Sequence, residues 1–145
     1  YLWVTGTSKS TINYSYEFYK NSINILNKKP NKVLEIASND GTFLKPFKEN
    51  NSQVFGIDPA KNIAEIANKK NIKTYDDFFN SSSFDKYEHS IGKVDFIFAR
   101  NVLAHVPDPM DFIKGIKSFI FTLSKIPNTK NISFLFSFPL FDAHS

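Results

Sequence analysis

The stretch KVLEIASNDG, which runs from Lys32 to Gly41, decides the fold. Its first half is a short apolar run, and its second half changes abruptly to small and polar residues. Apolar residues then recur at helical spacing between Thr42 and Phe47. This order is typical of a buried parallel strand, a tight turn and a helix whose N-terminus faces a ligand. We therefore predict a strand over 32–36 and a helix over about 42–50.

The same strand–helix unit recurs along the rest of the chain. An N-terminal helix is predicted from Ser10 or Thr11 to about Leu26. The acid–proline pairs Asp58-Pro59 and Asp108-Pro109 each predict a helix start, with the acid as cap and proline at the first helical position. Further strands are predicted over 53–57, 71–75, 94–99 and 132–140, and helices over about 83–91 and 108–126. The alternation predicts an α/β class, with a Rossmann-like, mostly parallel sheet covered by helices on both faces.

Polar residues collect where the predicted strands end. In a parallel sheet these carboxyl ends share one edge, and ligands bind there at the switch point of the strand order. The ends carry these residues: 37–41, Asp58, 76–78 and 100–105. We therefore expect the functional site at this edge.

The first turn disfavours a dinucleotide. A pyrophosphate site needs several glycines, as in G-x-G-x-x-G, whereas this turn has only Gly41 and carries the acid Asp40. A P-loop is excluded because no G-K-[ST] follows. Asp58, at the end of the second strand, can accept hydrogen bonds from both hydroxyls of a ribose. S-adenosyl-L-methionine fits these features, because it combines adenosine, a sulfonium and an amino-acid tail; an NAD-binding domain is the disfavoured alternative.

Composition narrows the class of protein. The 145 residues are enough for one domain with a real core, and no apolar run reaches membrane-spanning length. The absence of cysteine removes disulfides and thiolate metal sites, and it fits the reducing cytoplasm. The net charge of +4 comes from lysines spread over many segments, which is typical of solvated surfaces. We expect a small-molecule substrate without metal, nucleic acid or membrane, and the oligomeric state stays open.

Four segments in order carry a family resemblance: LEIASNDGTFL, FGIDPAKNIAEIA, NIKTYDDFF and RNVLAHVPDPMDFIKGI. They resemble class I S-adenosylmethionine-dependent methyltransferases and, more narrowly, the sugar C-methyltransferases that act on nucleotide-linked keto-deoxysugars. The resemblance extends from Tyr1 to about Pro139. It implies the seven-stranded methyltransferase sheet, of which this chain supplies five strands. It also implies S-adenosyl-L-methionine as cofactor and methyl transfer to a carbon next to a ketone.

The resemblance implies roles for individual residues. The methionine part of the cofactor is lined by Glu35, Ala37, Ser38, Asn39, Asp40 and Gly41. Asp58, followed by Pro59, holds the ribose, while Asp77 and Phe78 flank the adenine. Asn101 lies beneath the sulfonium, and Tyr1 and the 5–8 turn border the pocket. His105 faces the substrate as the candidate catalytic acid or base.

Three alternatives stay open at the level of residues. His105 can instead be a packed loop histidine. Arg100, the one arginine of the chain, can bind a substrate phosphate or form a salt bridge with a local acid. Asp58 can act as a helix cap.

The domain prediction is a single S-adenosylmethionine-binding unit over 1–145. Residues 1–30 form an N-terminal turn and helix that border the site, and 31–145 form the core. Family members carry an N-terminal zinc-binding module and a Tyr-His-Glu-His segment after the fifth strand, which this sequence lacks. We therefore expect a fragment of a longer protein. The functional alternatives are methyl transfer to oxygen or nitrogen of another small molecule, or cofactor binding without autonomous activity.

Overall fold

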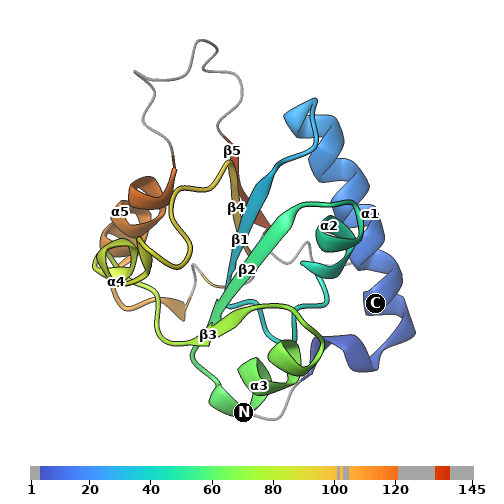
Figure 1. Cartoon of the computed structure of the whole chain (residues 1–145), viewed down its shortest axis with the longest axis horizontal. Helices are drawn as coiled ribbons and strands as arrows, with labels where there is room; N and C mark the ends of the chain where they lie inside the picture. Colours follow the sequence, from blue (N-terminus) through green and yellow to red (C-terminus); the bar gives the residue numbers. More distant parts are fainter. Residues whose placement is uncertain (1–3, 101, 103–104, 121–132, 138–145) are drawn as a thin grey trace.

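The computed structural model describes residues 4–100, 102 and 105–120, and the backbone of 133–137. Strands and helices alternate along this part of the chain (Figure 1). The elements are η1 (Thr5–Thr7), α1 (Lys9–Leu26), β1 (Lys32–Ile36), α2 (Lys45–Glu49), β2 (Gln53–Asp58), α3 (Lys61–Lys69), β3 (Thr74–Asp76), α4 (Ser83–Tyr87), β4 (Phe96–Arg100), α5 (Pro109–Phe119) and β5 (Ser133–Ser137).

The described strands form one parallel five-stranded sheet in the order β3-β2-β1-β4-β5. The strand β1 lies at the centre, and the chain order reverses there, because β2 pairs with one edge of β1 and β4 with the other. In the register, Glu35 of β1 lies between Gly56 and Phe98. The predicted α/β class and parallel Rossmann-like sheet are confirmed. The carboxyl ends of the strands consequently meet at one edge, at the switch point.

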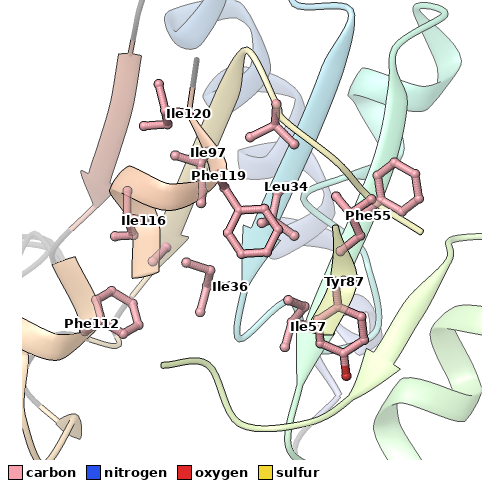
Figure 2. Packing of buried hydrophobic residues seen from close by; sticks show 13 residues of the cluster. Leu34, Ile36, Phe55, Ile57, Tyr87, Ile97, Phe112, Ile116, Phe119 and Ile120 are labelled. Carbon is pink, nitrogen blue, oxygen red and sulfur yellow. The ribbon is translucent and has the colours of Figure 1, made fainter. Parts of the chain in front are cut away.

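Helices cover both faces of the sheet, with α4 and α5 on one side and α1 and α2 on the other (Figure 1). Side chains alternate along β1, so Leu34 and Ile36 point to the face that α4 and α5 cover, and Val33 points to the face that α1 and α2 cover. Figure 2 shows the hydrophobic cluster on the α4 and α5 side of the sheet, in which Leu34 and Ile36 pack with residues of β2, β4 and α5. Glu35 shares the face of Val33, so its carboxyl group lies under the α1 side.

Two predicted element starts can be compared directly. The helix start at Asp108 is correct, because its carboxylate accepts hydrogen bonds from the N–H groups of Met110 and Asp111 at 3.1 and 3.2 Å. The start at Asp58 is wrong, since α3 begins at Lys61 with Ala60 as its cap. Asp58 ends β2, and its carboxylate bridges two loops instead.

Other boundaries differ by a few residues. The predicted strand over 32–36 is correct, and Pro46 lies in the first turn of α2, where proline is tolerated. Helix α2 is shorter than predicted because a turn over 40–44 precedes it. Strand β3 begins later than predicted, and α4 is shorter. Helix α5 ends at Phe119, because Ile120 leaves it to pair with Val94. Across the described ranges, no helix is both long and apolar enough to cross a membrane.

Candidate functional site

The turn after β1 bends sharply over the neighbouring strand. Ala37 and Asn39 have left-handed backbones with φ of 55° and 54°, a conformation unfavourable for residues other than glycine. The N–H groups of Ala37 and Ser38 both donate to the carbonyl of Ile57, at 2.7 and 3.3 Å. Ser38 lies directly on Gly56, where an added Cβ would overlap its hydroxyl. The absence of a side chain at Gly56 therefore allows the turn to reach its position.

Asp58 fixes the end of β2 against this turn. Its Oδ2 accepts the N–H of Asn39 at 2.8 Å, and its Oδ1 accepts the N–H of Ala60 at 2.9 Å. The side chain is buried, yet it lines a cavity. Because each carboxylate oxygen has two lone pairs, both oxygens keep capacity for a second donor. The geometry suits a carboxylate that receives two hydroxyl groups.

Two adjoining cavities occupy the carboxyl edge of the sheet. The first measures about 510 Å³, and the second about 530 Å³. They share Ala37, Pro59 and Val102, so they meet at the switch point. The first is lined by Thr5, Thr11, Glu35, Ala37, Ser38, Asn39, Phe43, Asp58, Pro59, Ala60, Arg100 and Val102. Asp77, Phe78 and His105 line the second.

Glu35 is buried with an unused hydrogen-bonding atom. Its side chain is 2% exposed, and Oε2 has no hydrogen-bond partner within the described part of the chain. Burial raises the pKa of Glu35 well above its ordinary value; the positive charge of Arg100 lowers it, and Asp40 and Asp58 raise it further. A buried carboxyl group in this state suits a ligand that brings a hydrogen-bond donor or a positive charge, because either offsets the loss of water.

Arg100, at the end of β4, faces the same cavity as Glu35. Its guanidinium carbon lies 3.2 Å from the ring centroid of Phe43 and 5.7 Å from that of Tyr14. Its Nε is buried and lacks a hydrogen-bond partner among the residues that the structure places. Burial lowers the pKa of Arg100, whereas Glu35 raises it. The predicted salt bridge with a local acid does not form within these residues, because no carboxylate oxygen lies within 4.0 Å of Arg100.

The side chain of Asp40 points to the other side of the turn. Its Oδ2 accepts the N–H of Gly6 at 3.0 Å and the Nζ of Lys70 at 2.8 Å, and its Oδ1 accepts the hydroxyl of Thr42 at 2.7 Å. Asp40 and Gly41 line a separate cavity of about 310 Å³, which α1 and α2 border. Asp40 and Gly41 were predicted to line the cofactor site, but neither lines the two cavities at the strand ends, and the charge of Asp40 is neutralised by Lys70.

The second cavity presents an exposed aromatic ring. Phe78 is 73% exposed, although it lines the cavity wall. Asp77 beside it is held by Lys86 Nζ at 2.6 Å and Tyr87 Oη at 2.7 Å. The hydrogen bond from Lys86 lowers the pKa of Asp77 despite partial burial. The ring of Phe78 is thus exposed to a ligand in the second cavity, and Asp77 stabilises the loop that carries this ring.

His105 also lines the second cavity. It is exposed, and its backbone N–H donates to the carbonyl of Val102 at 2.9 Å. The structure thereby places His105 and Phe78 at one cavity, while their roles toward the substrate and the adenine stay predictions. Two other predicted site residues, Asn101 and Tyr1, lie outside the described residues.

Sequence reasoning missed the residues that hold Arg100, and it missed Thr11 as a residue of the cavity wall. Phe43 and Tyr14 look like core or surface aromatics in the sequence, and only the fold brings them to Arg100. Thr5 and Thr11 also line the first cavity. The hydroxyl-rich 5–8 segment was the signal that predicted a role for Thr5, whereas Thr11 lies outside this segment.

Comparison with known proteins agrees with this architecture. The model of a family described as "Methyltransferase domain" matches residues 14–124. C-methyltransferase NovU from Streptomyces niveus is 28% identical over 88 residues, which are 61% of this chain and 21% of NovU. The chain thus spans about a fifth of that relative.

Solved structures share the fold at low sequence identity. The plantazolicin methyltransferase BpumL, solved in complex with a pentazolic desmethylPZN analog and SAH, has a TM-score of 0.62 at 14% identity, over 86% of this chain and 55% of BpumL. A SAM-dependent methyltransferase from Archaeoglobus fulgidus has a TM-score of 0.60 at 16% identity, over 75% of this chain and 48% of the other. With the family model matching most of its length, this chain belongs to the methyltransferase domain family.

Proposed function

We propose that this chain binds S-adenosyl-L-methionine in the two adjoining cavities and forms the cofactor-binding part of a methyltransferase. The observation that carries the proposal is the Asp58 carboxylate, fixed by two backbone N–H groups beside the place where the cavities meet. A nucleoside with extensions in both directions suits such a site, because its ribose hydroxyls can donate to the carboxylate.

The residues on either side fit the remaining parts of the cofactor. Phe78 offers an exposed ring against which adenine can stack in the second cavity. Glu35 offers an unpartnered carboxylate oxygen to the ammonium group in the first cavity. The backbone of 37–39 lines the path between these ends. No pyrophosphate fits as well, because Glu35 and Asp58 line the same cavity and repel it.

We further propose that the methyl group goes to a carbon of a nucleotide-linked keto-sugar. The bound cofactor supplies an electrophilic methyl group on a sulfonium. His105 is the proposed base: its imidazole accepts the proton from the carbon next to the substrate ketone, which leaves a nucleophilic enolate. Its exposed position at the second cavity and the likeness to C-methyltransferase NovU support this role.

Calorimetric titration tests cofactor binding. We expect S-adenosylmethionine and S-adenosylhomocysteine to bind and NAD not to bind. Asp58→Asn should weaken binding about 10-fold or more, or ~1.4 kcal/mol, since it loses the charge that the ribose hydroxyls meet. The matched control is Asp76→Asn, because Asp76 pairs with Asp58 in the strand register but is exposed and lines neither cavity. Equal effects of both substitutions, or binding of NAD, would contradict the proposal.

A product analysis with the full-length protein tests the acceptor atom. The protein is incubated with a keto-sugar nucleotide and cofactor that carries a ¹³C-labelled methyl group. We expect a product whose methyl signal in the NMR spectrum is that of a carbon-bound methyl group. An oxygen-bound or nitrogen-bound methyl signal would favour the alternative acceptors. His105→Gln should abolish turnover while cofactor affinity stays within about twofold.

A further inference from the structure

The environment of Arg100 resembles that of a ligand-binding group. A buried polar atom is unfavourable unless it has a hydrogen-bond partner, yet the buried Nε of the half-buried Arg100 has none within the described residues. The group is also held in place, because its planar head lies against the ring of Phe43 and near that of Tyr14. The fold therefore positions a cation at the cavity wall without supplying an acceptor for its Nε among the described residues.

Glu35 shows the complementary property in the same cavity. Its Oε2 is buried and unpartnered, and the two opposite charges influence each other without forming an ion pair. A buried carboxyl group and a half-buried guanidinium that each retain a buried atom without a partner match a ligand that carries both charges. The amino-acid end of S-adenosylmethionine is such a zwitterion.

From this arrangement we infer that Arg100 binds the carboxylate of the cofactor's amino-acid end, while Glu35 receives the ammonium. The inference rests on the proposed function. Arginine suits this role because its planar fork matches a carboxylate with two parallel hydrogen bonds. Prior ordering by Phe43 reduces the entropy lost on binding.

The cavity disfavours a phosphate of the substrate as the partner of Arg100. A phosphate would bring additional negative charge next to Glu35 and Asp58, which line the same cavity. A carboxylate that arrives with its own ammonium adds no net charge. Arg100 is therefore assigned to the cofactor, and the substrate-phosphate role predicted from the sequence is not retained.

Matched ligands can isolate this contact. The first ligand is S-adenosylhomocysteine, which carries the whole amino-acid end. The second is its decarboxylated analogue, S-adenosyl-3-thiopropylamine, which keeps the ammonium. The third is 5′-methylthioadenosine, which lacks both groups. Affinities are measured by calorimetry for the wild type, Arg100→Met and Arg100→Lys, and thermal melts confirm that each variant is folded.

We expect Arg100→Met to weaken S-adenosylhomocysteine about 10- to 100-fold and to leave the other two ligands within about twofold or tighter. Arg100→Lys should restore part of the loss, because it keeps the charge but not the fork. An equal loss for all three ligands would show a structural role and overturn the inference. No loss for any ligand would also overturn it, while leaving the proposed function intact. Failure of the wild type to bind any of them would overturn both.

Discussion

Glu35 and Asp40 are buried carboxylic acids at the two ends of one short segment, and their surroundings are opposite. Asp40 accepts hydrogen bonds from Gly6, Thr42 and Lys70. Glu35 keeps an oxygen with no partner in the described structure. Burial acts on both, yet the pKa of Glu35 is raised and that of Asp40 is lowered, because only Asp40 has donors that outweigh burial. Hydrogen-bond satisfaction, more than burial, thus separates an acid that stabilises the fold from one available to a ligand.

The strongest test of this contrast removes the satisfied acid. Asp40→Ala leaves Lys70, Thr42 and the N–H of Gly6 without their acceptor, so the free energy of unfolding should fall by about 2–3 kcal/mol. Lys70 is partly exposed, which limits the loss. Urea denaturation measures the change. A loss below about 0.5 kcal/mol, within the range of surface substitutions, would contradict the claim that Asp40 stabilises the fold.

The same acid predicts a pH dependence. The pKa of Asp40 is lowered, since hydrogen bonds from Lys70 and Thr42 outweigh the effect of burial. The contribution of the Asp40 carboxylate to the free energy of unfolding is therefore complete above the ordinary pKa of an aspartate, 3.8, and this contribution is lost as the pH falls toward the lowered pKa. Denaturation between pH 3 and 5 should show a steeper acid loss for the wild type than for Asp40→Asn.

The next effect concerns the turn between the two acids. In Gly56→Ala the new Cβ meets Ser38, whose own Cβ would lie 2.8 Å away. We expect a loss of about 2 kcal/mol in the free energy of unfolding and of about 10-fold in cofactor affinity, because the turn must move. Gly92→Ala is the control: with φ of +72° it is strained, but nothing lies within 3.4 Å of its Cβ. Its cofactor affinity should stay unchanged; a weakened affinity would point to a general loss of folding.

Glu35→Gln tests the unsatisfied acid. Because the pKa of Glu35 is raised in the fold, the wild type loses stability relative to the variant as the pH rises from about 4.5 through the folded pKa. At neutral pH the variant should melt ~2–4 °C higher, about 1 kcal/mol for a domain of this size. Differential scanning calorimetry at several pH values measures the difference.

Cofactor affinity sharpens the same test. The ammonium group of the cofactor needs the ionised carboxylate of Glu35. The wild-type affinity for the cofactor should therefore rise with pH in the window from about 4.5 through the folded pKa of Glu35. The affinity of Glu35→Gln should be about 10-fold lower above that window and independent of pH. A variant that is less stable than the wild type at every pH would show that Glu35 serves the fold as Asp40 does.

The smallest expected effect concerns backbone strain next to Glu35. Ala37 adopts φ of 55°, which costs an L-residue about 1–2 kcal/mol, whereas glycine loses about 0.5–1 kcal/mol in entropy. Ala37→Gly should therefore stabilise the fold by about 0.5 kcal/mol and leave cofactor affinity within twofold. Ala60→Gly is the control, because its φ of −85° is unstrained and glycine should destabilise there. Chemical denaturation compares the two variants; equal losses would exclude strain at Ala37.

Local patterns in the sequence predicted most of the fold. The apolar run of β1 and the Asp108-Pro109 start of α5 were correct, since neighbouring residues determine both. The same acid–proline pattern misled at Asp58, because the carboxylate there also bonds to the turn at Asn39, far away in sequence. The carboxyl edge of the sheet, where the sequence placed the functional site, does carry two cavities, because the alternation of strands and helices determines where the strand ends meet.

Side-chain pairing across the fold could not be predicted from the sequence. Asp40 was expected to face the ligand, but Lys70, thirty positions later, holds it on the opposite side. The free atoms of Glu35 and Arg100 depend on two different strands and on Phe43, which follows the turn. Such properties arise from packing of segments that are distant in sequence, so no local pattern indicates them.

Two backbone hydrogen bonds of the N-terminal turn η1 allow hydrogen exchange to report on the first cavity. The N–H groups of Thr5 and Gly6 donate to the side chains of Asn39 and Asp40 at 2.8 and 3.0 Å. These two amide hydrogens can exchange with solvent deuterium only when the turn lifts away, and Thr5 also lines the cavity. A ligand that fills the cavity must therefore slow their exchange, so two backbone amides record occupancy without any added label.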